Sequence, residues 1–275
     1  MFKFRNENLQ ESLNTRSHRS RERLFGTVRV HILALVSAIS FLMAAEVIHA
    51  QQLFVTSFNS NEVLRYDGTT GAFIDAFVTA GSGGLDSPGG LVFGPDDNLY
   101  VGSFNTDEVL RYDGTTGDFI DAFVTAGSGG LSGPDDLVFG PDGNLYVISE
   151  RTDEVLRYDG GTGAFIDAFV TAGSGGLDVP VGLVFGPDGN LYVSSGSTNE
   201  VLRYDGTTGA FIDAFVTAGS GGLDLPSFLI FFEPSTGGGG GCSVASAGAP
   251  VSVPLYLFVP LLFVIIRRVL RVLRG

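Results

Sequence analysis

A repeat of 46 residues constrains the fold of this chain more than any other feature of its sequence. The motif Leu-Val-Phe-Gly-Pro-Asp-Gly-Asn-Leu-Tyr-Val starts at Leu137 and at Leu183, and it recurs with one change from Leu91. The same spacing relates four arginines, which are Arg65, Arg111, Arg157 and Arg203. A period of this length is typical of repeat arrays, in which each unit buries its apolar face against its neighbours.

Each unit is expected to form four short strands and no helix of useful length. In the unit that contains Leu183, the strands are expected at about 182–185, 190–194, 200–204 and 211–218. Val, Phe, Tyr and Ile fill these segments, whereas Gly, Asp, Asn and Pro fill the turns between them. We name the connections by the strands that they join: the 1–2 turn, the 2–3 loop, the 3–4 turn, and the 4–1 loop that leads into the next unit.

Four-stranded units of this length are typical of β-propeller blades. The pattern Pro-x-Gly-Leu-Val-Phe-x-Pro-Asp-Gly-Asn-Leu-Tyr-Val, followed by Glu-Val-Leu-Arg-Tyr-Asp and Gly-x-Phe, resembles NHL-repeat and related propellers over about residues 53–231. The resemblance implies the fold and leaves the activity open, because those families include lyases, lactonases and pure binding modules. They have six or seven blades, whereas only four units are present here.

The two ends of the array are complementary. The first unit begins directly with a second strand at Leu53, and the last stretch, Pro226 to Phe231, matches a first strand with nothing after it. We therefore expect residues 51–235 to form an all-β propeller of four four-stranded blades, closed by strands from both termini. The alternative is an open array that completes itself by self-association.

Segments on both sides of the array resemble processing signals. Residues 1–50 contain an apolar run at 32–45 that suits a secretory signal peptide, with cleavage expected after Ala50 so that Gln51 becomes the first residue. An uncleaved anchor is the alternative. Residues 236–243 are a Gly-rich linker that ends in Gly241, Cys242 and Ser243. Residues 244–275 combine an apolar stretch that could cross a membrane with a basic tail that would stay cytoplasmic.

This C-terminal order resembles the tripartite sorting signals of bacterial surface proteins. The resemblance implies a sorting protease in the membrane as a partner, with Gly241, Cys242 and Ser243 as the processing point. We therefore expect an exported protein that is anchored by its C-terminal helix and then reaches the cell surface or the extracellular space. A permanent tail anchor is the alternative.

The composition of the array excludes several functions. Residues 51–266 contain five Arg, no Lys and no His, against 26 Asp or Glu. Such an acidic surface repels nucleic acid, so no nucleic-acid partner is expected. The imidazole and ammonium groups that often act as general acids and bases are missing. Four of the Arg precede an Asp by ten residues, and we expect structural ion pairs across the hairpin of the third and fourth strands.

Differences between the near-identical units concentrate in the 2–3 and 4–1 loops, which leave an up-and-down blade on the same side. We expect the ligand-binding face there, because binding residues gather on variable loops held by a rigid scaffold. Its Phe residues could stack on an apolar or sugar surface, and its Asn residues could hydrogen-bond to it. The candidates are Phe58, Asn59, Phe104, Asn105, Asp135, Asp136, Glu150, Arg151, Ser227 and Phe228.

The expected function is that of a non-catalytic binding or protein-interaction module. Its partner would be a surface protein, a glycan or a small molecule, and no cofactor is required. The alternative is a calcium- or magnesium-dependent hydrolase or lyase, with Asp135, Asp136 and Glu150 as weak candidates for metal ligands. That alternative is weakened because all three carboxylates belong to one unit, whereas a central metal needs ligands from several.

Overall fold

The computed structural model describes residues 51–232, in which the only regular elements are β-strands and five short 3₁₀ turns. The strands form one three-stranded and three four-stranded antiparallel sheets, which we call blades 1 to 4 in chain order. Blade 1 contains β1 (Gln52–Ser57), β2 (Glu62–Asp67) and β3 (Phe73–Val78). Blade 2 contains β4 (Pro88–Phe93), β5 (Leu99–Ser103), β6 (Glu108–Tyr112) and β7 (Phe119–Val124).

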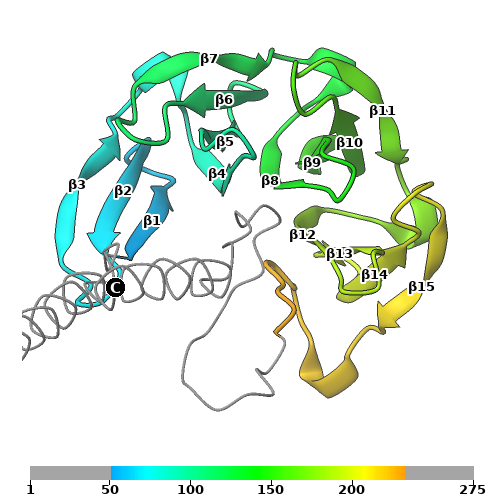
Figure 1. The fold of residues 1–275 in the computed structure, drawn as a ribbon. Helices are drawn as coiled ribbons and strands as arrows, with labels where there is room; N and C mark the ends of the chain where they lie inside the picture. Colours follow the sequence, from blue (N-terminus) through cyan, green and yellow to red (C-terminus); the bar gives the residue numbers. More distant parts are fainter. Residues whose placement is uncertain (1–50, 233–275) are drawn as a thin grey trace, which may run out of the picture. The chain divides into compact units, whose positions relative to one another are not determined.

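The other two blades repeat the pattern of blade 2. Blade 3 contains β8 (Pro134–Phe139), β9 (Leu145–Ser149), β10 (Glu154–Tyr158) and β11 (Phe165–Val170). Blade 4 contains β12 (Pro180–Phe185), β13 (Leu191–Ser195), β14 (Glu200–Tyr204) and β15 (Phe211–Val216). These bounds confirm the expected strands to within about two residues. The blades follow one another around an arc, with β3, β7, β11 and β15 on its outer side (Figure 1).

Five of the loops that follow strands contain a short 3₁₀ turn. Four of them are Ser-Gly-Gly turns in the 4–1 loops, and the fifth lies in the 2–3 loop of blade 3. They are η1 (Ser82–Gly84), η2 (Ser128–Gly130), η3 (Glu150–Thr152), η4 (Ser174–Gly176) and η5 (Ser220–Gly222). The middle Gly of each Ser-Gly-Gly turn has a positive φ, which a residue with a side chain adopts only with strain.

The core lies between the blades, where neighbouring sheets bury the faces that they turn toward one another. All five residues of β5, β9 and β13 are buried. In β5, the ring of Tyr100 lies 5.0 Å from that of Phe139 in the first strand of blade 3. Tyr146 of blade 3 makes the same edge-on contact with Phe185 of blade 4, also at 5.0 Å. Aromatic pairs in this geometry add to the stability that burial alone provides.

Three further contacts recur wherever one blade meets the next. Between blades 1 and 2, the Tyr112 hydroxyl donates to the Ser82 carbonyl at 2.8 Å. The ring of Phe119 packs on Gly83, where a Cβ atom would collide with it. In the 3–4 turn of blade 2, Gly117 packs closely against the Phe77 carbonyl of blade 1. The junctions between blades 2 and 3 and between blades 3 and 4 repeat all three contacts.

The expected ion pairs are confirmed. In each of the four hairpins, the Arg Nε donates to one Asp carboxylate oxygen at 3.0–3.1 Å and Nη2 donates to the other at 2.5–2.6 Å. The pairs are Arg65–Asp75, Arg111–Asp121, Arg157–Asp167 and Arg203–Asp213. Their register follows from the hairpin, because each Arg lies directly opposite its Asp on the neighbouring strand.

The expected closure of the ring within one chain is wrong. In the described residues, β1 pairs only with β2, and residues 226–232 form no strand. This segment instead lies against blade 4, where the ring of Phe231 is 4.8 Å from that of Tyr192. The rotation from each blade to the next is set by three like junctions, and four blades at this rotation do not bring the two ends together.

The expected processing segments fall outside residues 51–232. This applies to Ala50, to residues 233–235 at the end of the expected domain, and to Gly241, Cys242 and Ser243. Among the described residues, no helix is long and apolar enough to cross a membrane. The apolar stretch for which such a helix is expected lies beyond them.

Candidate functional site

The 2–3 and 4–1 loops lie together on one side of the blades, as the sequence predicts. In blade 2, the Phe104 amide donates to the Ser87 carbonyl and the Asn105 amide donates to the Asp86 carbonyl, both at 3.3 Å. In blade 3, the Glu150 amide donates to the Gly133 carbonyl at 3.1 Å. We call this surface the loop face.

A side chain at the end of each 2–3 loop also ties the loop face together from blade to blade. Asp107 of blade 2 accepts a hydrogen bond from the Gly133 amide, 26 residues further along the chain, at 2.8 Å. Asn61, Asp153 and Asn199 make the same bond to the next 4–1 loop, at 2.7–2.8 Å. All four adopt positive φ, which Asn and Asp tolerate better than other residues with side chains. This role of the four side chains was not predicted from the sequence.

Phe58, Phe104 and Arg151 form a continuous strip across blades 1 to 3. The rings of Phe58 and Phe104 are 6.1 Å apart. The guanidinium of Arg151 lies over the Phe104 ring at 4.4 Å from its centre, a cation–π contact. Phe58 is 49% exposed and the Arg151 side chain is 42% exposed, so the strip is open to a partner. The structure thus brings three of the predicted residues together.

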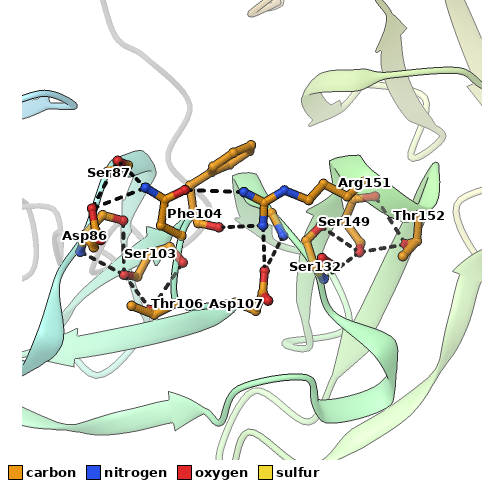
Figure 2. Close-up of polar contacts among 12 residues, drawn as sticks. Asp86, Ser87, Ser103, Phe104, Thr106, Asp107, Ser132, Ser149, Arg151 and Thr152 are labelled. Carbon is orange, nitrogen blue, oxygen red and sulfur yellow. Dashed lines mark hydrogen bonds and ion pairs between the residues drawn. The ribbon is translucent and has the colours of Figure 1, made fainter.

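Arg151 is held in place by the loop of blade 2 (Figure 2). Its Nη1 donates to the Phe104 carbonyl at 3.3 Å and to the Asp107 carboxylate at 3.0 Å. Its Nη2 donates to the Asn105 side-chain oxygen at 3.3 Å, while the Asn105 amide nitrogen donates to Ser87 Oγ at 2.9 Å. Asn105 and Arg151 therefore stiffen the loop face, and Asn59 and Asn105 are both exposed.

The three carboxylates lie nearby but differ in role. Asp136 accepts hydrogen bonds from the Leu137 amide at 2.9 Å and from the Leu183 amide of blade 4 at 3.1 Å. Burial nevertheless raises its pKa to about 6. Burial, with the neighbouring charges of Glu150 and Asp136, raises the pKa of Asp135 to about 7. Burial also raises the pKa of Glu150.

These carboxylates do not assemble into a metal site. Residues 51–232 contain no group of three or more His, Cys, Asp or Glu side chains placed to hold a metal ion. Asp136 satisfies two backbone amides of neighbouring blades, which accounts for its position without a cation. Within the described residues, Asp135, Asp136 and Glu150 are therefore not grouped as ligands of one calcium or magnesium ion.

Ser227 and Phe228 lie apart from the strip, at the other end of the array. The Ser227 carbonyl accepts a hydrogen bond from Ser194 Oγ of blade 4 at 2.5 Å. The Phe228 side chain is 66% exposed. Because the arc is open, the structure does not bring Phe228 beside Phe58.

Comparisons with known proteins agree with this architecture. No protein-family model matches the chain, and no curated protein matches it. Among solved structures, the chain is similar to virginiamycin B lyase from Staphylococcus aureus, at 16% identity, with 66% of this chain and 56% of the lyase covered and a TM-score of 0.50. It is also similar to a protein described as a gluconolactonase, at 18% identity, covering 66% of this chain and 65% of that protein, with a TM-score of 0.52.

A chain of the nidogen/laminin complex is similar too, at 19% identity, with 64% of this chain and 62% of that chain covered and a TM-score of 0.49. At such identities, the likeness to the lyase and the gluconolactonase shows the β-propeller fold alone. The chain spans less than two thirds of the length of those two proteins.

Proposed function

We propose that this protein is an exported β-propeller, displayed at the cell surface, that binds a partner through its loop face without catalysis. The observation that carries the proposal is the contrast between the two faces of near-identical blades. In the 1–2 turns of the opposite face, one contact recurs: the hydroxyls of Tyr100, Tyr146 and Tyr192 each donate at 3.0 Å to an Asp four residues earlier. On the loop face, the blades carry different side chains, and Phe58, Phe104 and Arg151 form one open strip.

The chemistry of this strip favours a partner with a flat apolar or sugar surface. Exposed aromatic rings offer a large contact area at a low cost in conformational entropy, and sugar faces and aliphatic side chains stack on them. Asn59, which is exposed and follows Phe58 in the sequence, adds a polar group. The partner is therefore a surface protein, a glycan or a small molecule, and the acidic composition argues against nucleic acid.

A metal-dependent hydrolase or lyase is the weaker alternative. The raised pKa of Asp135, about 7, would suit a general acid or base near neutral pH. However, no metal-holding group occurs within residues 51–232, and these residues contain no His or Lys. A perturbed carboxyl group is also expected wherever a carboxylate is packed between blades.

Binding by labelled protein to intact cells and to a glycan array tests the proposal. Phe58→Ala combined with Phe104→Ala should abolish binding, because both rings of the strip are removed. Asp135→Asn combined with Glu150→Gln should leave binding intact, because it removes charge and keeps shape.

Thr115→Lys, in an exposed 3–4 turn of the opposite face, is the matched surface control. Binding that survives the Phe variant and is lost in Thr115→Lys would contradict the assignment of the face. Loss of binding in the carboxylate variant, together with a dependence on calcium or magnesium, would favour the enzyme.

A further inference from the structure

The two ends of the array carry the unmatched halves of one blade junction. At each of the three internal junctions, a Tyr hydroxyl bond, a Phe packed on Gly and a Gly packed on a Phe carbonyl join one blade to the next, and the first strand of that next blade pairs with its second strand. Blade 1 has the half that donates the Tyr hydroxyl and inserts the Phe ring, without a preceding blade to receive them. Blade 4 has the receiving half, the Ser-Gly-Gly turn that accepts the Tyr and Phe side chains, without a following blade.

The strand edges match residue by residue. Within blades 2, 3 and 4, Leu91, Leu137 and Leu183 of the first strands lie opposite Val101, Val147 and Val193 of the second strands. At the ends of the array, the equivalent residues are Leu229 and Val55, and neither has a strand partner of that kind among the described residues. The exposure of β1 reflects the missing strand: Leu53 is 52% exposed, whereas its equivalents Leu99, Leu145 and Leu191 are completely buried.

The side-chain contacts of blade 1 are equally incomplete. The hydroxyls of Tyr112, Tyr158 and Tyr204 bond to the first Ser of a Ser-Gly-Gly turn, and all three rings are fully buried. Tyr66 has no hydroxyl partner within residues 51–232, and it is only half-buried. Phe73 is 60% exposed, against 41–42% for Phe119, Phe165 and Phe211, which each pack on a glycine.

Blade 4 lacks the complementary contacts. Phe215 is 50% exposed, whereas Phe77, Phe123 and Phe169 are 5–6% exposed beneath the 3–4 turn of the next blade. The Gly71 turn, which would cover it, and Gly221, which would receive Phe73, meet nothing within 4 Å. Meanwhile, Leu225 is already bonded to Asn199 and Phe231 already packs on Tyr192. Residues 226–231 are thus held in the position of a first strand, but no second strand pairs with them among the described residues.

We propose that a second copy of this chain supplies the missing junction. Residues 226–231 of one copy pair antiparallel with β1 of the other, with Leu229 opposite Val55. Tyr66 then donates to the Ser220 carbonyl, Phe73 packs on Gly221, and Gly71 covers Phe215. Because the contact is head-to-tail, a second identical junction closes a ring of two chains. The ring contains eight blades, which is within the size range of known propellers.

Site-directed cross-linking of the full-length protein in mild detergent tests the pairing. Val55→Cys and Leu229→Cys are placed in separate proteins, each with Cys242→Ser to remove the native thiol, and the two are mixed. Facing residues of antiparallel strands lie close enough for a short bismaleimide to join them. The mixture should give a cross-linked species of two chains, whereas Val55→Cys mixed with Thr115→Cys should not.

Light scattering should give the mass of two chains at high concentration and of one chain on dilution. Tyr66→Phe should leave the thermal stability of the monomer unchanged and raise the dissociation constant by roughly 30-fold, because each of two junctions loses one hydrogen bond. Tyr112→Phe, the internal counterpart, should lower the monomer's stability instead. No cross-link from the mixture, or masses above two chains, would overturn the proposal. So would the finding that a protein with Val55→Cys and Leu229→Cys in the same chain cross-links within that chain while the mixture does not cross-link.

Discussion

Replacing Asp135 by Asn should stabilise the protein at neutral pH and leave it nearly unchanged at pH 4. The pKa of Asp135 is raised from 3.8 to about 7 by burial and by the charges of Glu150 and Asp136. The native state therefore holds this proton more tightly than the unfolded chain does. The contribution of Asp135 to stability is fully present below pH 3.8, and it is lost as the pH rises through about 7.

The size of the effect follows from the same shift. About three pKa units correspond to a ceiling of about 4 kcal/mol. The carboxyl is only partly buried, and solvent screening reduces this to about 1–2 kcal/mol. Asn keeps the shape of the side chain and carries no charge at any of these pH values. Its advantage should therefore grow from near zero at pH 4 to a plateau above pH 7.

Urea unfolding followed by circular dichroism at pH 4, 6 and 8 measures this difference. Asp97→Asn, in an exposed 1–2 turn of the opposite face, is the control and should show no comparable trend. Asp136→Asn should not give the stabilisation expected of Asp135→Asn. Each oxygen of the Asp136 carboxylate accepts a hydrogen bond from a backbone amide, whereas an Asn side chain has only one oxygen that can accept. The reasoning would be refuted if the Asp135→Asn protein were less stable than the parent at pH 8. It would also be refuted if the difference in free energy of unfolding between the two proteins did not change with pH.

Two other predictions concern the backbone and the ends of the chain. Val179 adopts a φ of 52°, and the equivalent position one repeat earlier is Gly133. Because a valine is strained at positive φ, Val179→Gly should stabilise the protein by about 0.5–1 kcal/mol in urea unfolding. Gly133→Val should destabilise the protein by more than 1 kcal/mol, since the new Cβ would crowd Arg151. A destabilised Val179→Gly protein or a stabilised Gly133→Val protein would disprove the strain argument. Intact-mass analysis of the cell-derived protein should find Gln51 first and a C-terminus near Gly241 or Cys242. A mass that still includes the sequence after Ile266 would instead indicate a permanent membrane anchor.

The strands and their hairpins could be predicted because they depend on short sequence distances. The alternation of Leu, Tyr and Val and the turn Gly-Pro-Asp-Gly-Asn determine the register of each pair. That register places Arg157 opposite Asp167 in the structure, as the spacing of ten residues predicts. Contacts of this kind need no knowledge of how one blade turns against the next.

Closure and the roles of individual site residues could not be predicted in the same way. Whether the ends meet depends on the rotation between blades, which is set by packing such as that of Tyr100 on Phe139. Asp136 looked like a metal ligand from sequence, but its carboxylate bonds an amide 47 residues away. The bond between Asp107 and Gly133 spans 26 residues, and only its recurrence at Asn61, Asp153 and Asn199 could have indicated it.

Near-identical blades also create a problem during folding, because any blade can dock against the wrong neighbour and still form every contact that the junctions share. Arg151 distinguishes one arrangement from the others. Its ion pair with Asp107 is specific to blade 2, because the loops of blades 1 and 4 carry the neutral Asn61 and Asn199 at that position. Blade 3 docked on blade 1 would lose this ion pair, and docked on blade 4 it would also exchange Phe104 and Asn105 for Gly196 and Ser197. In a chain whose sequence hardly distinguishes its own parts, one arginine helps to specify the order of assembly.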